Sequence, residues 1–495
     1  MGTSTSRVGL ASGPVDVQIC AQCLRYFGTS RSLLPSLPAP FLVSNTPLSI
    51  STRNLLRIAL PISLGSLVQF VVVLTDNFFL SRAGELELNG AGNAALVYLT
   101  FVMVLTGGSM GIQILVARHH GAGQTKHMSE AARTGRVALL ALGILLAGMV
   151  LGINAFGGWA PLMQSQEVRD VFAPFLSIRA WGLIPYALLM ALEGDWIGQA
   201  KTRPLLPLAL LMASINMALD AYWVEGLWGG PVLGADGAAR ASLIAETTGA
   251  LVALAYAKFR LHPASFVGTW SLDRAALQQW WKLSAPVMAQ FGLTIGTWAS
   301  FFFFVERVGM MELKVSHLTR NAFMLAFVVC TGVGQTVRTV VSNLIGEGRQ
   351  HDLQPALLRL LVLSYLGVGI LTHGYLLYPD WIASHFFSGP SSEAGLNAMS
   401  DTLGTAFVAV QLYAASAVAI AVLQGAGFTK HAFWVELTSV TAYILVAYVM
   451  TLVAPQPIHV IWRADWLYFG GILAGSLLCL RLLPWRHGST DLGPS

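Results

Sequence analysis

Long apolar segments recur along the whole chain, and they leave few options for its fold. Of the 495 residues, 55% are hydrophobic and only 11% are charged. Apolar runs of about 20 residues match a hydrocarbon core of roughly 30 Å. Lipid offers backbone groups no hydrogen-bonding partners, so these segments must be helices. The sequence therefore predicts an all-α polytopic membrane protein with almost no soluble domain.

Hydropathy predicts twelve membrane-spanning helices arranged as two bundles of six. The spans lie near residues 55–80, 92–117, 134–158, 168–197, 204–224, 237–257, 280–306, 315–343, 355–378, 399–425, 432–453 and 458–480. The predicted regions are a disordered N-terminal tail (1–50), an N-terminal six-helix bundle (51–260), a cytoplasmic linker (261–279), a C-terminal six-helix bundle (280–481) and a C-terminal tail (482–495).

The placement of basic residues predicts which side of the membrane each loop faces. On the predicted topology, 21 of the 29 Lys and Arg residues fall on the side that holds both termini. Cytoplasmic loops of membrane proteins carry an excess of Lys and Arg. We therefore expect both termini on the cytoplasmic side of a bacterial inner membrane. The net charge of +5 does not indicate a nucleic-acid partner, because no basic cluster with interleaved aromatic residues is present.

The two halves of the chain are an internal repeat. Residues 57–84 and 282–309 match at an offset of 225, and this offset aligns Pro61 with Pro286. Because each repeat has six spans, both halves enter the membrane from the same side. We expect a pseudo-twofold axis along the membrane normal, with a cavity between the halves near the bilayer midplane.

Three polar residues in the first half are the main candidates for a functional site. Asp76 lies near the outer end of the first span, and Asn216 and Asp220 lie four residues apart in the fifth span. A spacing of four places both side chains on one helical face, at a depth similar to that of Asp76. Two carboxylates and an amide can bind a small cation such as sodium through oxygen, or hold a proton that relieves their repulsion. The alternative is that each acid caps a neighbouring helix or meets a lysine.

Other charged residues within the spans are additional candidates. Glu246 lies in the middle of the sixth span, and Arg179 in the fourth span is expected to pair with an acid or extend toward the interface. Glu193 and Asp195 lie toward the cytoplasmic end of the fourth span, where a solvated rim is the simpler expectation. Glu436 begins the eleventh span and is expected at the membrane interface.

Sequence motifs for enzymatic chemistry are missing. The chain has no GxxxxGK[ST] loop for a nucleotide and no HExxH metal motif. A membrane enzyme acting on a lipid would need a metal or a nucleophile constellation, and none is found. We therefore expect no enzyme and no cofactor, and a proton or sodium ion as the only inorganic ligand.

Several segments together resemble the multidrug and toxic compound extrusion (MATE) family. They are ALPISLG and TDNFFLSRAG in the first span, VARHHGAGQ after the second, IRAWGLIPYALLMALEG in the fourth and INMALD in the fifth. The resemblance implies two six-helix bundles around a central cleft and export of cationic or amphipathic small molecules in exchange for protons or sodium ions. It also implies coupling-cation binding at Asp76, Asn216 and Asp220, and a hinge at Pro61. We expect a monomer in the bilayer.

The second half departs from the pattern of this family. Some members carry coupling acids on the seventh and tenth spans, but residues 285–298 and 406–416 contain no acid here. Coupling is therefore expected in the first half. The alternative function, a lipid-linked oligosaccharide flippase of a related superfamily, predicts a strongly basic cavity, and only Arg179 is a plausible cavity cation.

Overall fold

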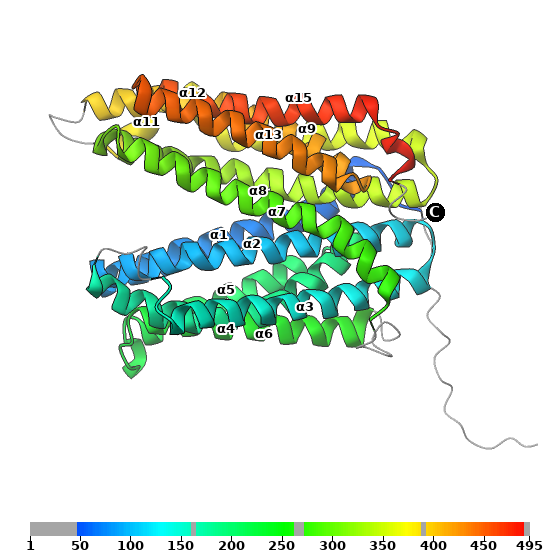
Figure 1. The fold of residues 1–495 in the computed structure, drawn as a ribbon, viewed down its shortest axis with the longest axis horizontal. Coiled ribbons are helices and arrows are strands. Elements are labelled where there is room, and N and C mark those ends of the chain that lie inside the picture. Colours follow the sequence, from blue (N-terminus) through cyan, green and yellow to red (C-terminus); the bar gives the residue numbers. More distant parts are fainter. Residues whose placement is uncertain (1–46, 160–164, 262–271, 388–392, 490–495) are drawn as a thin grey trace, which may run out of the picture. The chain divides into compact units, whose positions relative to one another are not determined.

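Twelve long helices dominate the computed structural model, which describes residues 47–159, 165–261, 272–387 and 393–489 (Figure 1). Each is long and apolar enough to cross a membrane, which confirms the predicted all-α membrane fold. They are α1 (Thr52–Ala83), α2 (Glu85–Gly121), α3 (Thr125–Ala155), α4 (Gln166–Gly198), α5 (Leu205–Trp223), α6 (Ala235–Tyr256), α7 (Arg274–Glu306), α8 (Met310–Gly346), α9 (Leu353–Thr372), α12 (Glu393–Gly425), α13 (Thr429–Tyr448) and α15 (Ala464–Leu482). The short helices α10 (Gly374–Leu377), α11 (Pro379–Ser384) and α14 (Ile458–Ile461) connect them.

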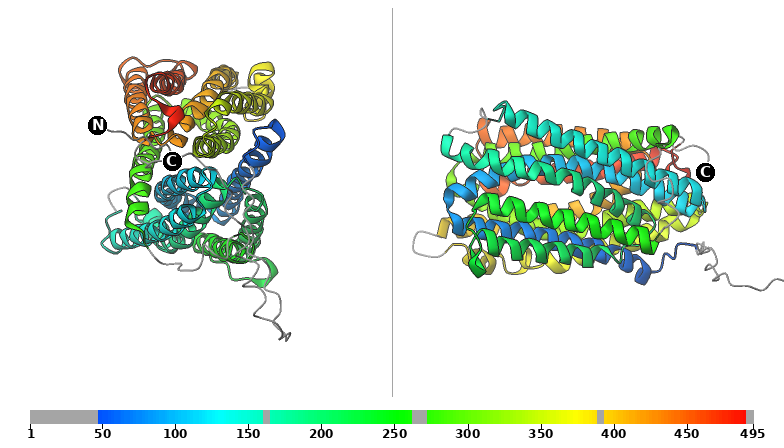
Figure 2. Two further views of the ribbon diagram at one scale, coloured as in Figure 1. Left: turned by 90° about the vertical axis from the view of Figure 1, so that its right-hand side faces the viewer. Right: turned by 90° about the horizontal axis from the view of Figure 1, so that it is seen from below.

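The helices form two bundles, which we call the N bundle (α1 to α6) and the C bundle (α7 to α15). In the N bundle, α1, α5, α6, α4 and α2 pack in a ring, and α3 packs outside the ring on α2 and α4. The C bundle repeats this plan with α7, α13, α15, α12 and α8 in the ring and α9 outside on α8 and α12. Figure 2 shows the two groups of helices seen along their axes. Each ring encloses an interior in which polar side chains are screened from lipid.

The element boundaries confirm the internal repeat. Helices α2 and α8 both have 37 residues, and their first and last residues differ by the predicted offset of 225. Gly123 and Gly348, each two residues after the end of its helix, have φ values of 68° and 70°. This left-handed conformation ends a helix and favours glycine. Both copies therefore stop the second helix of the repeat by the same turn.

The proline in the first helix of each repeat leaves one backbone carbonyl without its helical partner. Pro61 has no N–H to donate to the carbonyl of Arg57, four residues earlier. The hydroxyl of Thr202, in the α4–α5 connection, donates to this oxygen over 3.2 Å. The second repeat has the same arrangement, because Thr429 donates over 3.5 Å to the carbonyl four residues before Pro286. The expected hinge at Pro61 thus lies within the continuous helix α1, close to Thr202 in the α4–α5 connection.

We expect Thr202→Val to lower the stability of the protein by about 1–3 kcal/mol, because the Arg57 carbonyl, which has no helical partner, then loses its donor. Thermal unfolding of the purified protein in detergent would measure this. Thr441→Val is the matched control, because the exposed Thr441 hydroxyl bonds only within its own helix. Equal melting temperatures for the two variants would show that Thr202 does not support the proline site.

The bundles meet near the starts of α1 and α7 and the ends of α2 and α8, which we call the closed end. Here the helices approach so closely that a Cβ atom at Gly121 would lie 2.1 Å from the carbonyl oxygen of Asn343. At the equivalent Gly346 it would lie 2.2 Å from the carbonyl oxygen of Arg118. Within the described ranges, the side-chain hydrogen bonds between the bundles all lie in this half: Gln113 with Gln335 and Thr339, Arg118 with Ala426, His120 with Asn343, Thr339 with Ile197, Ser342 with Ile114, Asn343 with Gly198, Trp280 and Ser284 with Gly108, Thr134 with Asp273, and residues 48–50 with Glu347, Arg349 and Arg359.

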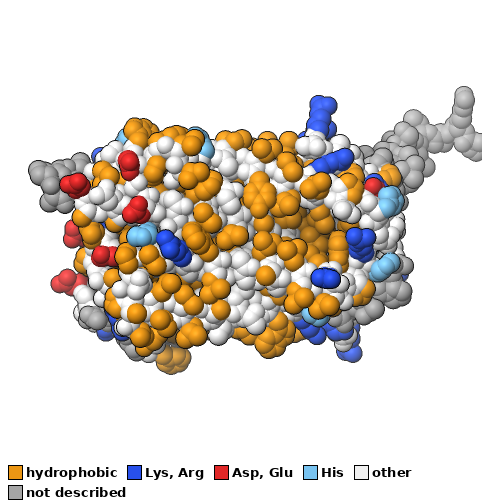
Figure 3. All heavy atoms as spheres, turned by 90° about the horizontal axis from the view of Figure 1, so that it is seen from above, with side chains coloured by type: hydrophobic (Ala, Val, Ile, Leu, Met, Phe, Trp, Pro, Cys, Tyr) orange, Lys and Arg blue, Asp and Glu red, His pale blue; other side chains and the backbone are white. Residues whose placement is uncertain are grey.

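The surface charges separate along the helix axes. Figure 3 shows acidic side chains gathered at one end and most visible Lys and Arg side chains at the other, with hydrophobic side chains covering the length between them. The basic end is the one at which the C-terminus lies in Figure 1, and it is also the closed end. The distribution on the folded chain thus follows the loop charges predicted from the sequence.

The described structure extends a few residues into both the predicted tail and the predicted linker. Residues 1–46 and 262–271 of these regions lie outside the described ranges. The N–H of Leu48, however, donates to the Glu347 carboxylate over 2.8 Å, so the last residues of the predicted tail pack on the C bundle. Helix α7 begins at Arg274 rather than near residue 280, with Asp273 accepting a backbone N–H of the first turn over 2.7 Å. Hydropathy placed the start near residue 280 because the polar Arg274, Gln278 and Gln279 surround the few apolar residues of this segment.

Candidate functional site

Polar side chains from all five ring helices converge in the interior of the N bundle. We call them the N-bundle cluster: Asp76 from α1, Tyr98 from α2, Arg179 from α4, Asn216 and Asp220 from α5, and Ser242 and Glu246 from α6. The structure therefore brings five of the residues singled out in the sequence into one interior. Ser242 and Tyr98 were not predicted, because a single hydroxyl within a span carries no distinguishing sequence signal.

Asp76, Asn216 and Asp220 lie next to one another. The Asp76 carboxyl group is within hydrogen-bonding reach of the Asp220, Asn216 and Ser242 side chains. The spacing of four on α5 turns both Asn216 and Asp220 toward α1, and their exposed fractions are 2% and 0%. The Asn216 amide nitrogen donates to the Ser242 hydroxyl over 3.3 Å. The amide oxygen of Asn216 is buried and has no hydrogen-bond partner among the described residues.

This group has too many acceptors and too few donors. Among the described residues, no donor serves the buried Asp76 Oδ1, Asn216 Oδ1 or either carboxylate oxygen of Asp220. Ionised carboxylates and amide oxygens only accept hydrogen bonds, so they cannot satisfy one another. Buried polar atoms normally have partners, and here a proton shared between the acids or a hard cation would supply one. These oxygen atoms are therefore suited to binding a proton or a small cation that prefers oxygen ligands, such as sodium.

Arg179 forms a separate unit beside the acids. Its Nη2 donates to Glu246 over 2.8 Å, and its guanidinium group lies 4.0 Å above the centre of the Tyr98 ring. The Tyr98 hydroxyl donates to the same carboxylate over 3.1 Å. A Cβ atom at Gly182 would lie 2.6 Å from Glu246 Oε2, so glycine on α4 makes room for this pair. Arg179 therefore pairs with Glu246 rather than extending toward the membrane interface. It compensates the charge of one of the three carboxylates of the cluster.

Glu193 and Asp195 lie elsewhere. They follow Arg179 by 14 or more residues on α4, which is about 20 Å or more along the helix toward the closed end. Asp195 is only 4% exposed and accepts a hydrogen bond from Gln199 over 2.6 Å, so the expected solvated rim is wrong for this residue. Glu193 is half-buried on a different face of α4, near Tyr186. The end of α4 is buried because the two bundles close over it.

The C bundle has a buried acid that was expected at the membrane interface. Glu436 on α13 is 3% exposed and lies inside the ring. Its carboxylate accepts hydrogen bonds from Gln290 (3.2 Å) and Thr294 (3.1 Å) of α7 and from the Tyr468 hydroxyl of α15. The prediction was wrong because the start of an apolar run does not show that neighbouring helices cover the residue.

The Glu436 carboxylate is part of a longer chain of hydrogen bonds. Gln424 of α12 donates to the Gln290 oxygen over 3.0 Å, and Arg338 of α8 donates to the Gln424 oxygen over 2.8 Å. A second acid, Asp465 on α15, is 8% exposed and lies beside Tyr443. Residues 285–298 of α7 and 406–416 of α12 contain no acid, but the interior of the C bundle does, because Glu436 and Asp465 come from α13 and α15.

We expect Glu436→Gln to lower stability by about 1–3 kcal/mol, because an amide NH₂ then faces donors that had an acceptor. The melting temperature of the purified variant would measure this. Glu306→Gln serves as the control, because Glu306 is exposed at the end of α7. A melting temperature equal to that of the control would show that the buried hydrogen bonds of Glu436 do not stabilise the C bundle.

The described part of the C bundle contains cavities on different sides. One of about 580 Å³ opens between α7 and α13 and is lined mainly by small and apolar residues: Ala289, Gly292, Leu293, Gly296, Thr297, Ser300, Phe433, Leu437, Val440 and Ile444. Its lining and size suit the apolar part of a small molecule. Another, of about 340 Å³, lies between α12, α14 and α15 and carries charged residues.

Comparison with known proteins places the chain in a family. The MatE family model matches residues 61–222 and 286–449, ranges that begin at the two equivalent prolines. "Probable multidrug resistance protein NorM" of Synechocystis sp. is 26% identical over 387 residues, which covers 76% of this chain and 83% of that protein. The protein of the same name in Bradyrhizobium diazoefficiens is 27% identical over 354 residues, with 70% and 75% covered.

A solved structure shares the fold. It is described as the outward-facing conformation of a multidrug resistance MATE family transporter of the MOP superfamily, and it superimposes with a TM-score of 0.78 at 17% identity. The match covers 90% of this chain and 97% of that chain. The family model itself spans well over half of the sequence, in both repeats. The chain therefore belongs to the MATE family of membrane transporters, and it is a transporter rather than an enzyme.

Proposed function

We propose that this protein exports cationic or amphipathic small molecules in exchange for protons or sodium ions. One observation carries the proposal: in one buried cluster, Asp76 Oδ1, Asn216 Oδ1 and both carboxylate oxygens of Asp220 have no hydrogen-bond partner among the described residues. An uncompensated acceptor group in a membrane helix bundle is expensive unless a cation binds there during the working cycle. The bacterial relatives named as probable multidrug resistance proteins support the direction and type of transport.

The proposed mechanism couples occupancy of this site to the position of α1. A proton or sodium ion between Asp76 and Asp220 removes their repulsion and draws α1 toward α5. The other half of α1 packs on α8, where a Cβ atom at Gly332 would lie 2.8 Å from the backbone nitrogen of Ser63. The cation therefore favours one packing of the bundles by its differential affinity for the two states. Binding from outside would favour release of the substrate outward.

The charge balance of the N-bundle cluster supports a cationic substrate. Its three carboxylates, those of Asp76, Asp220 and Glu246, face only one cation, Arg179. A binding interior for the phosphates of a lipid-linked oligosaccharide would have the opposite balance. The apolar cavity between α7 and α13 supports a substrate with an apolar part.

The proposed orientation places the closed end in the cytoplasm, so the structure corresponds to a form that is closed toward the cytoplasm. The charge bias of the loops and the acidic opposite end in Figure 3 support it. We expect a cysteine replacing Lys126, after α2, to resist a membrane-impermeant maleimide added to intact cells. A cysteine replacing Arg82, at the opposite end of α1, should react. Ready labelling at residue 126 and protection at residue 82 would reverse the topology.

Drug sensitivity in a host lacking its own pumps tests the proposed function. Expression should raise the tolerated concentration of cationic dyes and amphipathic drugs, and an ionophore that collapses the coupling gradient should abolish this effect. Resistance that persists after both proton and sodium gradients are collapsed would contradict exchange. Unchanged drug sensitivity together with rescue of a lipid-linked oligosaccharide flippase defect would favour the alternative function.

A further inference from the structure

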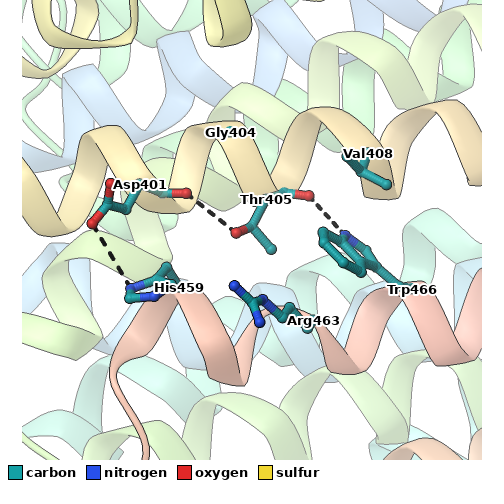
Figure 4. Close-up of a pocket in the computed structure, with 7 residues that line it drawn as sticks. All are labelled: Asp401, Gly404, Thr405, Val408, His459, Arg463 and Trp466. Atoms are coloured by element: carbon teal, nitrogen blue, oxygen red, sulfur yellow. Dashed lines mark hydrogen bonds and ion pairs between the residues drawn. The ribbon is translucent and has the colours of Figure 1, made fainter.

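The smaller cavity of the C bundle lies at the end opposite the closed end, between the start of α12 and the start of α15. Its lining residues are Asp401, Gly404, Thr405, Val408, His459, Arg463 and Trp466 (Figure 4). None of them takes part in the N-bundle cluster or in the contacts between the bundles described above. The cavity has a volume of about 340 Å³, at the lower end of the usual range for ligand pockets of roughly 300–1,000 Å³.

The pocket carries separated charges of opposite sign. Arg463 is exposed, and in the described part of the chain its guanidinium group has no acceptor; it only approaches the Trp466 ring, at 5.7 Å. Figure 4 shows this group in the space below Thr405, between His459 and Trp466. Asp401 lies across the pocket with its side chain 64% exposed, and its Oδ2 is 4.0 Å from His459 Nδ1. An unpaired cation and an accessible carboxylate therefore face the same space.

The walls between these charges are fixed. The Trp466 indole donates to the backbone oxygen of Thr405 over 2.9 Å, which ties α15 to α12. Space remains at Gly404, where an added Cβ atom would meet nothing within 4 Å. The Trp466 side of the pocket is thus held in place, and space for a ligand lies beside Gly404.

Its depth is that of a lipid headgroup. Helix α15 has 19 residues and is about 28 Å long, which nearly equals the hydrocarbon thickness of roughly 30 Å. Arg463, which directly precedes α15, therefore lies at the boundary of the hydrocarbon, and Trp466 lies in the interfacial layer that favours tryptophan. Val408, which lines the pocket, and Leu467, which follows Trp466 in the chain, expose 39% and 44% of their surface, as expected of side chains that face acyl chains.

We propose that this pocket binds a phospholipid with a zwitterionic, primary-ammonium headgroup, as in phosphatidylethanolamine. Arg463 would contact the phosphate through charge-assisted hydrogen bonds. Asp401 would accept the N–H groups of the ammonium, and the acyl chains would lie along Val408 and Leu467. Binding there would attach a lipid to the outer edge of the C bundle, away from the N-bundle cluster.

Native mass spectrometry of the full chain in detergent tests the proposal, with phosphatidylethanolamine, phosphatidylcholine and phosphatidylglycerol of matched acyl chains as probes. We expect phosphatidylethanolamine to bind most tightly, and Arg463→Gln to weaken it about tenfold or more, the usual effect of losing one charge-assisted contact. Asp401→Asn should remove the preference for ethanolamine over choline, whose nitrogen carries no hydrogen. Arg82→Gln is the control, because Arg82 lies at the same end of the molecule but is paired with Glu225 over 2.6 Å.

A second variant keeps the test decisive if Arg463→Gln does not fold. Gly404→Phe fills the pocket without changing any charge, and it should also lower phosphatidylethanolamine binding about tenfold or more relative to Arg82→Gln. Equal binding of phosphatidylethanolamine and phosphatidylglycerol, with no effect of Asp401→Asn, would overturn the zwitterionic site in favour of a simple anion site. Binding unaffected by Gly404→Phe would overturn the pocket altogether.

Discussion

Replacing Asp76 by Asn should abolish uphill export while leaving the folded protein intact. The two side chains have nearly the same shape, so packing in the N bundle should hardly change. The amide, however, can neither take up a proton nor supply charge to a sodium ion, and it brings a donor to a group that consists of acceptors. Cells expressing the variant should accumulate a fluorescent cationic dye to the level of cells without the transporter, whereas the wild type keeps the dye out.

The internal repeat supplies a matched control for this variant. At the offset of 225, Asp76 corresponds to Phe301, which packs against the rings of Tyr443 and Trp462 at 6.0 and 5.5 Å. Phe301→Leu should cost less than about 1.5 kcal/mol and retain export. If Asp76→Asn excludes the dye as well as the wild type at equal expression, Asp76 is a satisfied structural residue and not a coupling residue.

The substitution Gly121→Ala should favour the conformation in which the two bundles have separated at the closed end. The new Cβ atom would lie 2.1 Å from the Asn343 carbonyl oxygen, a backbone atom that cannot turn away. Alanine normally stabilises a helix relative to glycine, so any loss must come from the contact between α2 and α8. Overpacking of this size costs roughly 1–3 kcal/mol, enough to shift a two-state equilibrium about tenfold or more.

Cysteine accessibility would measure this shift. Thr339 is fully buried between the bundles at the closed end, so a cysteine replacing it should become reactive from the cytoplasmic side only when that end opens. Gly121→Ala should raise its labelling rate and lower export at least tenfold. Gly148→Ala on α3 is the control, because a Cβ atom there meets nothing within 4 Å. Equal labelling in the two backgrounds would show that the close approach at Gly121 does not hold the end shut.

The architecture could be predicted from the sequence because few physical rules govern it. The lengths of the apolar segments predicted the twelve spans, and the internal repeat predicted that the helices of the two halves correspond. The equal lengths of α2 and α8 show this correspondence. The convergence of Asp76 with Asn216 and Asp220 followed from helix depth and from a spacing of four residues. The role of these three residues in coupling stays a prediction.

The errors concern burial by neighbouring helices, which no local pattern encodes. Glu436 and Asp195 both stand near the ends of apolar runs, where exposure is the simplest expectation. The structure buries Glu436 against α7 and α15 and Asp195 beneath the contact of the two bundles. Similarly, no sequence pattern predicts that Thr202 bonds to the Arg57 carbonyl, because this bond depends on how α5 follows α4.

The repeat also shows how the two bundles diverged. The C-bundle counterpart of Asp76 is Phe301 at the offset of 225, and that of Asn216 is Tyr443 at an offset of 227, the offset that also relates Thr202 to Thr429. The rings of Phe301 and Tyr443 pack together inside the C bundle. An aromatic pair thus occupies the position at which the N bundle holds an uncompensated acid and amide. The C bundle instead satisfies its buried acid Glu436 with three hydrogen-bond donors and places its buried Asp465 beside Tyr443. This difference is the physical reason for assigning coupling to the N bundle.

Transport by the purified protein in vesicles tests this assignment most directly, with pH and sodium gradients imposed separately. The account predicts that one of the two gradients drives substrate movement by the wild type, and that neither gradient does so for Asp76→Asn or Asp220→Asn. Glu225→Gln, which changes an acid outside the N-bundle cluster, should behave as the wild type. Gradient-driven transport that survives in both aspartate variants would contradict coupling at this site.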